Sequence, residues 1–414
     1  MTKVAVYPRE KYKMITGAKE WCERLNIPYC EYIEPYYERG VALYRERGDF
    51  AFNGERIVAF NDKYSFMRRY LPEVLECSRL LYHDEDMALF VYVLAAIYEE
   101  DKTPYMTIDG VGLRILEAPD RGTLITDMAP IFSSFYFLDR MVAEMEGRGV
   151  PHKIISDSMN GMDTEINDYV GIYGRPGMKR YIAWYLNWVR CLLYRIGRFQ
   201  FKPAPFGKFV RVYRKGCDIV ALVDGRTVHR KGMCLGSGGQ TNEDEAFLAE
   251  IVEEDGAVIG YPVNRYGECE CERVRLEGYT EVLREGDMII EVHIPAKEPM
   301  TPEICEESYR AAEKFFRRCY PEYDFKAFTC QSWMLEKRIP ELLGKETNLT
   351  KFMDGYEIGF PMKSGGEGVY SFVFNVPEKL PPEELPEDTS LRRAIKKHLT
   401  DGGYIYEKGG IRLL

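Results

Sequence analysis

The sequence predicts a fold of the α+β or α/β class, in which a helical N-terminal domain precedes a mixed-sheet domain. In the first part of the chain, apolar residues recur at helical spacing over residues 65–100 and again over 125–147. After Phe201 the pattern changes to short apolar runs, separated by turn-like Lys-Gly, Asp-Gly, Tyr-Gly and Glu-Gly pairs. This change in periodicity indicates that helices and strands belong to different domains.

A length of 414 residues fits two or three domains. We expect residues 1–150 to form the mainly helical domain. Residues 151–376 would form the sheet domain and include a basic helix over 178–198. Residues 377–414 would be a linker rich in proline and acidic residues, followed by a C-terminal tail with a helix and a strand.

The elements of the sheet domain follow in order. Strands are expected at 210–215, 218–224, 227–232, 258–264, 270–276 and 287–295. A helix then begins at Thr301, whose hydroxyl can cap it, with Pro302 in its first turn, and it ends before Pro321. A strand at 326–334, a short helix at 335–343 and a pair of strands at 357–362 and 369–376 complete the domain. We expect strand 287–294 to lie in the interior of the sheet.

Composition excludes several classes of protein. Hydrophobic residues make up 45% of the chain and the net charge is −10, which describes a folded protein that nucleic acid and anionic membranes would repel overall. No apolar stretch is long enough to span a bilayer and the N-terminus lacks a signal-peptide core, so we expect a cytoplasmic protein with reduced cysteines. Cys269 and Cys271 lack the further ligands of a metal site, and no metal is expected.

One cationic segment stands out against this acidic background. Between Asp168 and Asp218 there is no acidic residue, while eleven lysines and arginines occur. Such a segment could bind an anionic ligand, or it could pair with the acidic helical domain along a seam. On the predicted helix, Arg195 and Arg198 are three residues apart and could converge on one anion.

Two further groups could carry chemistry. Strand alternation places Glu291 and His293 on one face, where the carboxylate could orient an imidazole acting as general base. The alternative is a structural histidine at the end of a strand. Cys330 could be a nucleophile beside His293, or a buried core thiol.

Several segments in order resemble a known family. They are Gly149-Val150-Pro151, Tyr194 to Phe201, His293 to Ala296, Cys330 to Leu335 and Thr347-Asn348-Leu349. Together they resemble bacterial acyltransferase-like proteins that have an N-acyltransferase-type helical N-terminal domain and a GNAT-like C-terminal domain. The resemblance spans residues 85–375.

This resemblance implies an N-acyltransferase that moves an acyl group from acyl-CoA, as co-substrate, to a small-molecule amine acceptor. It implies His293 or Glu291 as base. The residues themselves add Cys330 as a further catalytic candidate, and Arg195, Arg198 and Lys297 as the cations expected to bind the cofactor. The glycine-rich phosphate signature of GNAT proteins is absent, and Glu298 and Glu303 stand near the expected pyrophosphate. The alternative is therefore a non-catalytic small-molecule-binding or interaction module on a degenerate GNAT scaffold.

Overall fold

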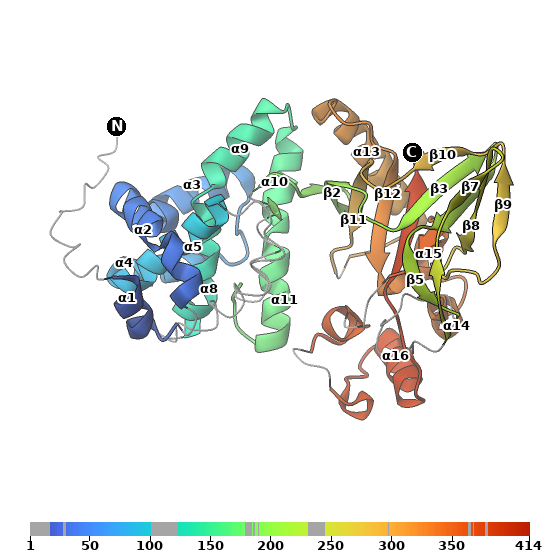
Figure 1. Cartoon of the computed structure of the whole chain (residues 1–414). Coiled ribbons are helices and arrows are strands. Elements are labelled where there is room, and N and C mark those ends of the chain that lie inside the picture. Colours follow the sequence, from blue (N-terminus) through green and yellow to red (C-terminus); the bar gives the residue numbers. More distant parts are fainter. Residues whose placement is uncertain are drawn as a thin grey trace. The chain divides into compact units, whose positions relative to one another are not determined.

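The computed structural model shows two compact units, Met1–Tyr194 and Arg195–Leu414. It describes residues 17–27, 30–100, 123–178, 184, 187–188, 190–230, 245–296, 298–362, 366, 368–376 and 380–414. The helical unit extends beyond residue 150, the expected boundary, because α10 (His152–Gly161) and α11 (Asp163–Tyr173) continue it. The predicted order of a helical region followed by a mixed-sheet region is confirmed (Figure 1).

The helical unit confirms the two predicted helical stretches. Its other helices are α1 (Ala18–Leu25), α2 (Cys30–Arg47), α3 (Gly54–Tyr64), α4 (Leu71–His83), α5 (Glu85–Glu100), α8 (Thr123–Phe135) and α9 (Leu138–Gly147). Helix α5 is apolar on every side, and residues 87–98 are all buried. A helix of this kind belongs at the centre of a helical core, and α2, α4 and α8 pack against it.

Glu165, on α11, should make the stability of this unit depend on pH. Burial raises the pKa of Glu165 to about 8; repulsion from Asp168 adds to the shift, and a hydrogen bond with Trp184 opposes it. An unfolded glutamate loses its proton near pH 4.3. Between that pH and about 8 the folded state holds a proton that the unfolded state has lost, so stability falls as pH rises. In Glu165→Gln this fall should be reduced, as urea unfolding at pH 5 and pH 8 would show. If the free energy of unfolding changed equally with pH in wild type and Glu165→Gln, the role of Glu165 in this pH dependence would be contradicted.

The C-terminal unit contains a mixed sheet with the strand order β1-β2-β11-β12-β14-β13. Its strands are β1 (Tyr194–Ile196), β2 (Phe199–Pro205), β11 (Met288–His293), β12 (Ala327–Ser332), β13 (Ile358–Phe360) and β14 (Lys408–Leu413). Strands β11 and β12 are parallel, and their other neighbours are antiparallel. The predicted interior position of strand 287–294 is confirmed.

A second, antiparallel sheet packs on one face of the first. It contains β3 (Val210–Lys215), β4 (Asp218–Val223), β7 (Val252–Glu254), β8 (Ala257–Val263), β9 (Val274–Glu277) and β10 (Thr280–Leu283). Strands β5 (Arg226–His229) and β6 (Ala246–Ala249) form a separate pair. A shared apolar core joins Ala204, Ile289 and Ile411 of the first sheet to Val212 and Ala221 of the second. This core fixes the face of β11 on which Glu291 and His293 lie.

Helix α13 (Pro302–Cys319) covers the opposite face of the first sheet (Figure 1). Its predicted start is confirmed, since Thr301 caps it by accepting a hydrogen bond from the Ile304 N–H at 3.5 Å. Its Tyr309 ring contacts Phe199 and Phe328, at centroid separations of 5.3 and 5.1 Å. An aromatic layer therefore fastens the helix to strands β2 and β12.

Two sequence expectations differ from the structure, while the helix and strand expected in the C-terminal tail are both present. The basic helix does not continue to residue 198, because Tyr194–Ile196 is strand β1 and Gly197 and Arg198 form a turn. Residues 369–374 form a π-helix instead of the predicted strand. The terminal segment contributes helix α16 (Ser390–Thr400) and strand β14, and β14 lies between β12 and β13 inside the sheet. Long-range pairing places β14 there, and local sequence carries no signal for such pairing.

Candidate functional site

Strands β11 and β12 part at the edge of the sheet where both end. Their pairing runs from Ile290 and Phe328 to Val292 and Cys330. Beyond it, β11 continues to His293 against β2, and β12 continues to Ser332 against β14. Two parallel neighbours that separate in this way leave main-chain groups between them that the sheet no longer uses. A ligand at the carboxyl ends of parallel strands can use such groups.

Glu291 and His293 meet on the face of β11 that the second sheet partly covers. His293 Nε2 lies 3.5 Å from Glu291 Oε2, and Lys202 Nζ of β2 lies 3.1 Å from the same oxygen. The His293 side chain is 31% exposed, although Nε2 itself, which faces Glu291, is buried. The structure thus brings together the carboxylate and imidazole that strand alternation predicted. Lys202 is an addition, because the sequence does not reveal the register of β2 against β11.

Glu291 is held as a carboxylate. Burial raises its pKa, but the contact with His293 and the charge of Lys202 outweigh burial and bring the pKa down to about 2. Lys208, in the loop after β2, is a second nearby cation; burial lowers its pKa, and the charge of Glu291 opposes this shift. A carboxylate that binds protons so weakly is a poor general base near neutral pH. The arrangement instead suits Glu291 to orienting His293 and stabilising an imidazolium.

Cys330 lies on the other face of the sheet. It pairs in register with Val292, so its side chain points away from the face that carries Glu291 and His293. Its residue is 2% exposed, and burial raises the pKa of its thiol to about 12, opposed by a hydrogen bond with Tyr356. The structure does not bring Cys330 and His293 together. It gives the thiol the surroundings of a core residue, the alternative that the sequence left open.

Arg195 and Arg198 belong to the β1–β2 hairpin and not to a helical face. The hairpin turn contains Gly197, whose φ is +60°, and a Cβ there would collide with Ser308 of α13. Arg195 forms an ion pair with the Glu298 carboxylate. Arg198 is 4% exposed, and its guanidinium donates to main-chain carbonyls of the loop between β11 and α13. Both arginines therefore contact the loop where the resemblance places the pyrophosphate.

The loop between β11 and α13 comprises residues 294–301. Lys297, the third residue expected to bind the cofactor, lies outside the described residues. The Glu298 carboxylate is offset by Arg195, which removes one of the two negative charges expected to oppose a diphosphate. The sequence could not show this pairing, because the partners are 103 residues apart.

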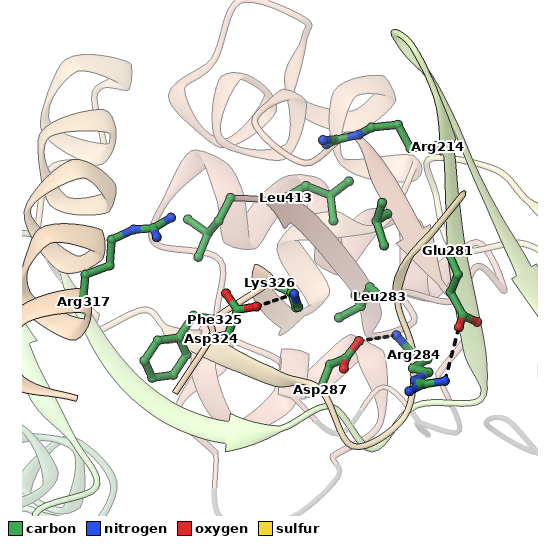
Figure 2. Close-up of a pocket in the computed structure, with 12 residues that line it drawn as sticks. Arg214, Glu281, Leu283, Arg284, Asp287, Arg317, Asp324, Phe325, Lys326 and Leu413 are labelled. Carbon is green, nitrogen blue, oxygen red and sulfur yellow. Dashed lines mark hydrogen bonds and ion pairs between the residues drawn. The ribbon is translucent and has the colours of Figure 1, made fainter. Parts of the chain in front are cut away.

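A pocket of about 570 Å³ opens at the opposite end of β11 and β12 (Figure 2). Its charged side chains largely satisfy one another. Lys326 Nζ donates to Asp324 at 2.5 Å, and Arg284 Nη1 lies 3.7 Å from Glu281 Oε2. None of the predicted site residues lines this pocket, so we do not place the site there.

Neither a membrane-spanning helix nor a metal site is found in the part of the chain that the structure describes. No described helix is both long and apolar enough to cross a bilayer. No group of three or more His, Cys, Asp or Glu side chains there could hold a metal ion.

The mixed sheet, its parting parallel strands and the capped helix after them define a protein of the GNAT-like class. Residues 193–412, more than half of the chain, match the family model described as the GNAT-like C-terminal domain. The chain therefore belongs to this family. No curated protein matches it.

Solved structures with a similar fold cover both units. One is an acyltransferase mutant in complex with octanoyl-CoA, with 16% identity, a TM-score of 0.64 and coverage of 96% of this chain and 100% of that chain. Another is an acyltransferase in complex with decanoyl-CoA and teicoplanin, with 16% identity, a TM-score of 0.62 and the same coverage. A third, in complex with CoA and 10C-teicoplanin, has 15% identity, a TM-score of 0.62 and again the same coverage. At these identities the likeness is one of fold.

Proposed function

We propose that this protein is an N-acyltransferase that moves an acyl group from acyl-CoA to a small amine acceptor. The observation that carries the proposal is the Glu291–His293 pair at the edge where β11 and β12 part, next to the start of α13. Family membership supports it, and so do similar folds whose structures hold acyl-CoA or CoA. We also propose a cytoplasmic setting, as the sequence analysis expects.

His293 would act as the general base. The neutral imidazole takes a proton from the acceptor amine as the lone pair of its nitrogen bonds to the thioester carbonyl carbon, and Glu291 stabilises the imidazolium that forms. Main-chain N–H groups between the parted strands would stabilise the oxyanion. The oxyanion then collapses to the amide as the C–S bond breaks, and the imidazolium gives its proton to the departing CoA thiolate. For the helical unit we propose a role in shaping substrate binding, in line with the N-acyltransferase type that the resemblance implies.

A thermal-shift titration tests donor binding. Acetyl-CoA and free CoA should raise the unfolding midpoint, because a ligand bound only by the folded state stabilises it by about 2.7 kcal/mol at 100 times its Kd. ADP, which carries only the nucleotide diphosphate part, should give a smaller rise. No shift with any of the three would contradict acyl-CoA use.

A turnover assay distinguishes an acyltransferase from the alternative, a non-catalytic binding module. Release of CoA from acetyl-CoA and decanoyl-CoA should be followed by chromatography with amines, amino sugars and teicoplanin as acceptors. Acceptor-dependent release supports the transferase. CoA binding without release for any acceptor would favour the non-catalytic binding module, which the missing glycine signature also favours.

A further inference from the structure

We propose that Arg198 is a positioning residue that orients the main chain at residues 295–296 and 298–300, in the loop before α13, for the CoA diphosphate, in place of the missing glycine-rich signature. The inference rests on the proposed function. Arg198 follows Gly197 at the tip of the β1–β2 hairpin, and its own N–H donates to Ser308 Oγ of α13 at 2.7 Å. Ser308 Oγ in turn donates to the Ile304 carbonyl at 3.0 Å, so the hairpin tip is anchored to the first turns of the helix.

The guanidinium of Arg198 donates hydrogen bonds to three main-chain carbonyls of this loop. Nε donates to the Pro299 carbonyl at 2.9 Å, and Nη2 donates to the carbonyls of Pro295 at 2.8 Å and Glu298 at 3.2 Å. Three carbonyls are thus turned toward one planar, fixed group of donors. Lysine has no such planar array and could not reproduce this geometry.

The direction of each of these carbonyls determines the direction of the N–H group in the same peptide unit. In a trans peptide unit the N–H points opposite to the C=O. Carbonyls of Pro295 and Pro299 that face Arg198 therefore turn the N–H groups of Ala296 and Met300 away from it. Neither N–H has a hydrogen-bond partner among the residues that the structure describes. Outward main-chain N–H groups before a helix N-terminus are the donors that bind phosphates.

The loop is also stiff, and the buried guanidinium of Arg198 lies against it. Pro295, Pro299 and Pro302 each fix a backbone φ angle, which lowers the entropy lost when a ligand orders the loop. Arg198 is buried, and its Nη1 donates no hydrogen bond to any described residue. Its contacts are neutral carbonyls, because the nearby Glu298 carboxylate pairs with Arg195. A buried cation without a contacting carboxylate would be stabilised by an anion on the other side of the loop.

The test compares two acyl donors that differ in the diphosphate. In Arg198→Lys and Arg198→Met, kcat/KM for acetyl-CoA should fall on the order of tenfold or more, mainly through KM, as expected for losing hydrogen bonds to a charged group. The value of kcat/KM for acetyl-pantetheine, which lacks the diphosphate, should fall much less in these variants. Hydrogen exchange in peptides covering 294–301 should also be faster in the unliganded variants.

The matched control is Arg412→Met. Arg412 donates to Glu306 of α13 at 2.8 Å and stacks on Tyr309 at 4.6 Å, so its loss loosens the same helix without touching the loop. Arg412→Met should lower the unfolding midpoint. It should leave the ratio of kcat/KM for acetyl-CoA to kcat/KM for acetyl-pantetheine unchanged. Ser308→Ala offers a milder change at the hairpin tip and should alter the ratio in the same direction as the Arg198 variants.

The outcomes separate this inference from the function on which it rests. If wild-type protein neither binds CoA nor uses acetyl-CoA, the proposed function fails. If wild type uses acetyl-CoA and the Arg198 and Ser308 variants keep the wild-type ratio between donors, the positioning role alone is overturned. The positioning role would also be overturned if Arg412→Met changed the ratio of kcat/KM between the two donors as the Arg198 variants do. The effect would then come from the helix as a whole.

Discussion

In His293→Ala, turnover should fall on the order of 100-fold or more, while the unfolding midpoint changes little. Loss of a general base removes the proton transfer that accompanies attack and typically costs 10²–10⁴ in rate. The ring is 31% exposed at the end of β11, so its removal leaves no large cavity. The measurement is acceptor-dependent CoA release at saturating acetyl-CoA, beside a thermal unfolding scan.

A second variant tests the role assigned to Glu291. Glu291→Gln keeps the shape of the side chain and removes its charge. It should lower turnover less than His293→Ala does, because the base remains but its imidazolium is no longer stabilised.

A structural role for His293 gives the opposite pattern. If the ring serves only as a hydrogen-bond partner, His293→Ala should destabilise the protein by about 1–3 kcal/mol and leave turnover per folded molecule near the wild-type value. That result would remove His293 from the proposed mechanism.

Local patterns predicted what depends on local interactions. Apolar spacing predicted helices α4, α5, α8 and α9, and the cap at Thr301 with Pro302 predicted the start of α13. Alternation along one strand was enough to place Glu291 and His293 on a common face. These signals are contained within a few residues, where propensity and periodicity decide the structure.

The remaining features depend on partners that are distant in sequence. The pairing of Lys202 with Glu291 follows from the antiparallel register of β2 and β11, which joins residues 89 apart. Arg195 and Arg198 looked like neighbours on a helix because the run before them has helical spacing. The turn at Gly197 instead fits against Ser308, a contact that appears only when the hairpin and α13 come together. Tertiary packing overrode the local pattern there.

The same tertiary contacts make Phe199 the residue whose loss should destabilise the sheet unit most clearly. Phe199 follows Arg198 and is fully buried. Its ring centroid lies 5.3 Å from Tyr309, 5.7 Å from Phe352 and 6.0 Å from Phe201. Phe199→Ala would remove the centre of this layer and leave a cavity that its aromatic neighbours only partly fill. The expected loss in the free energy of unfolding is about 3–5 kcal/mol.

The measurement must isolate this unit, because two units can unfold in separate transitions. Hydrogen exchange in β11 as a function of urea reports on the sheet to which Phe199 belongs. The matched control is Phe372→Ala, because Phe372 is 62% exposed and loses the same atoms without a cavity. Its effect should lie within about 0.5 kcal/mol of zero. Equal effects of the two changes would contradict the aromatic layer as the attachment of α13, since burial would then not decide the cost.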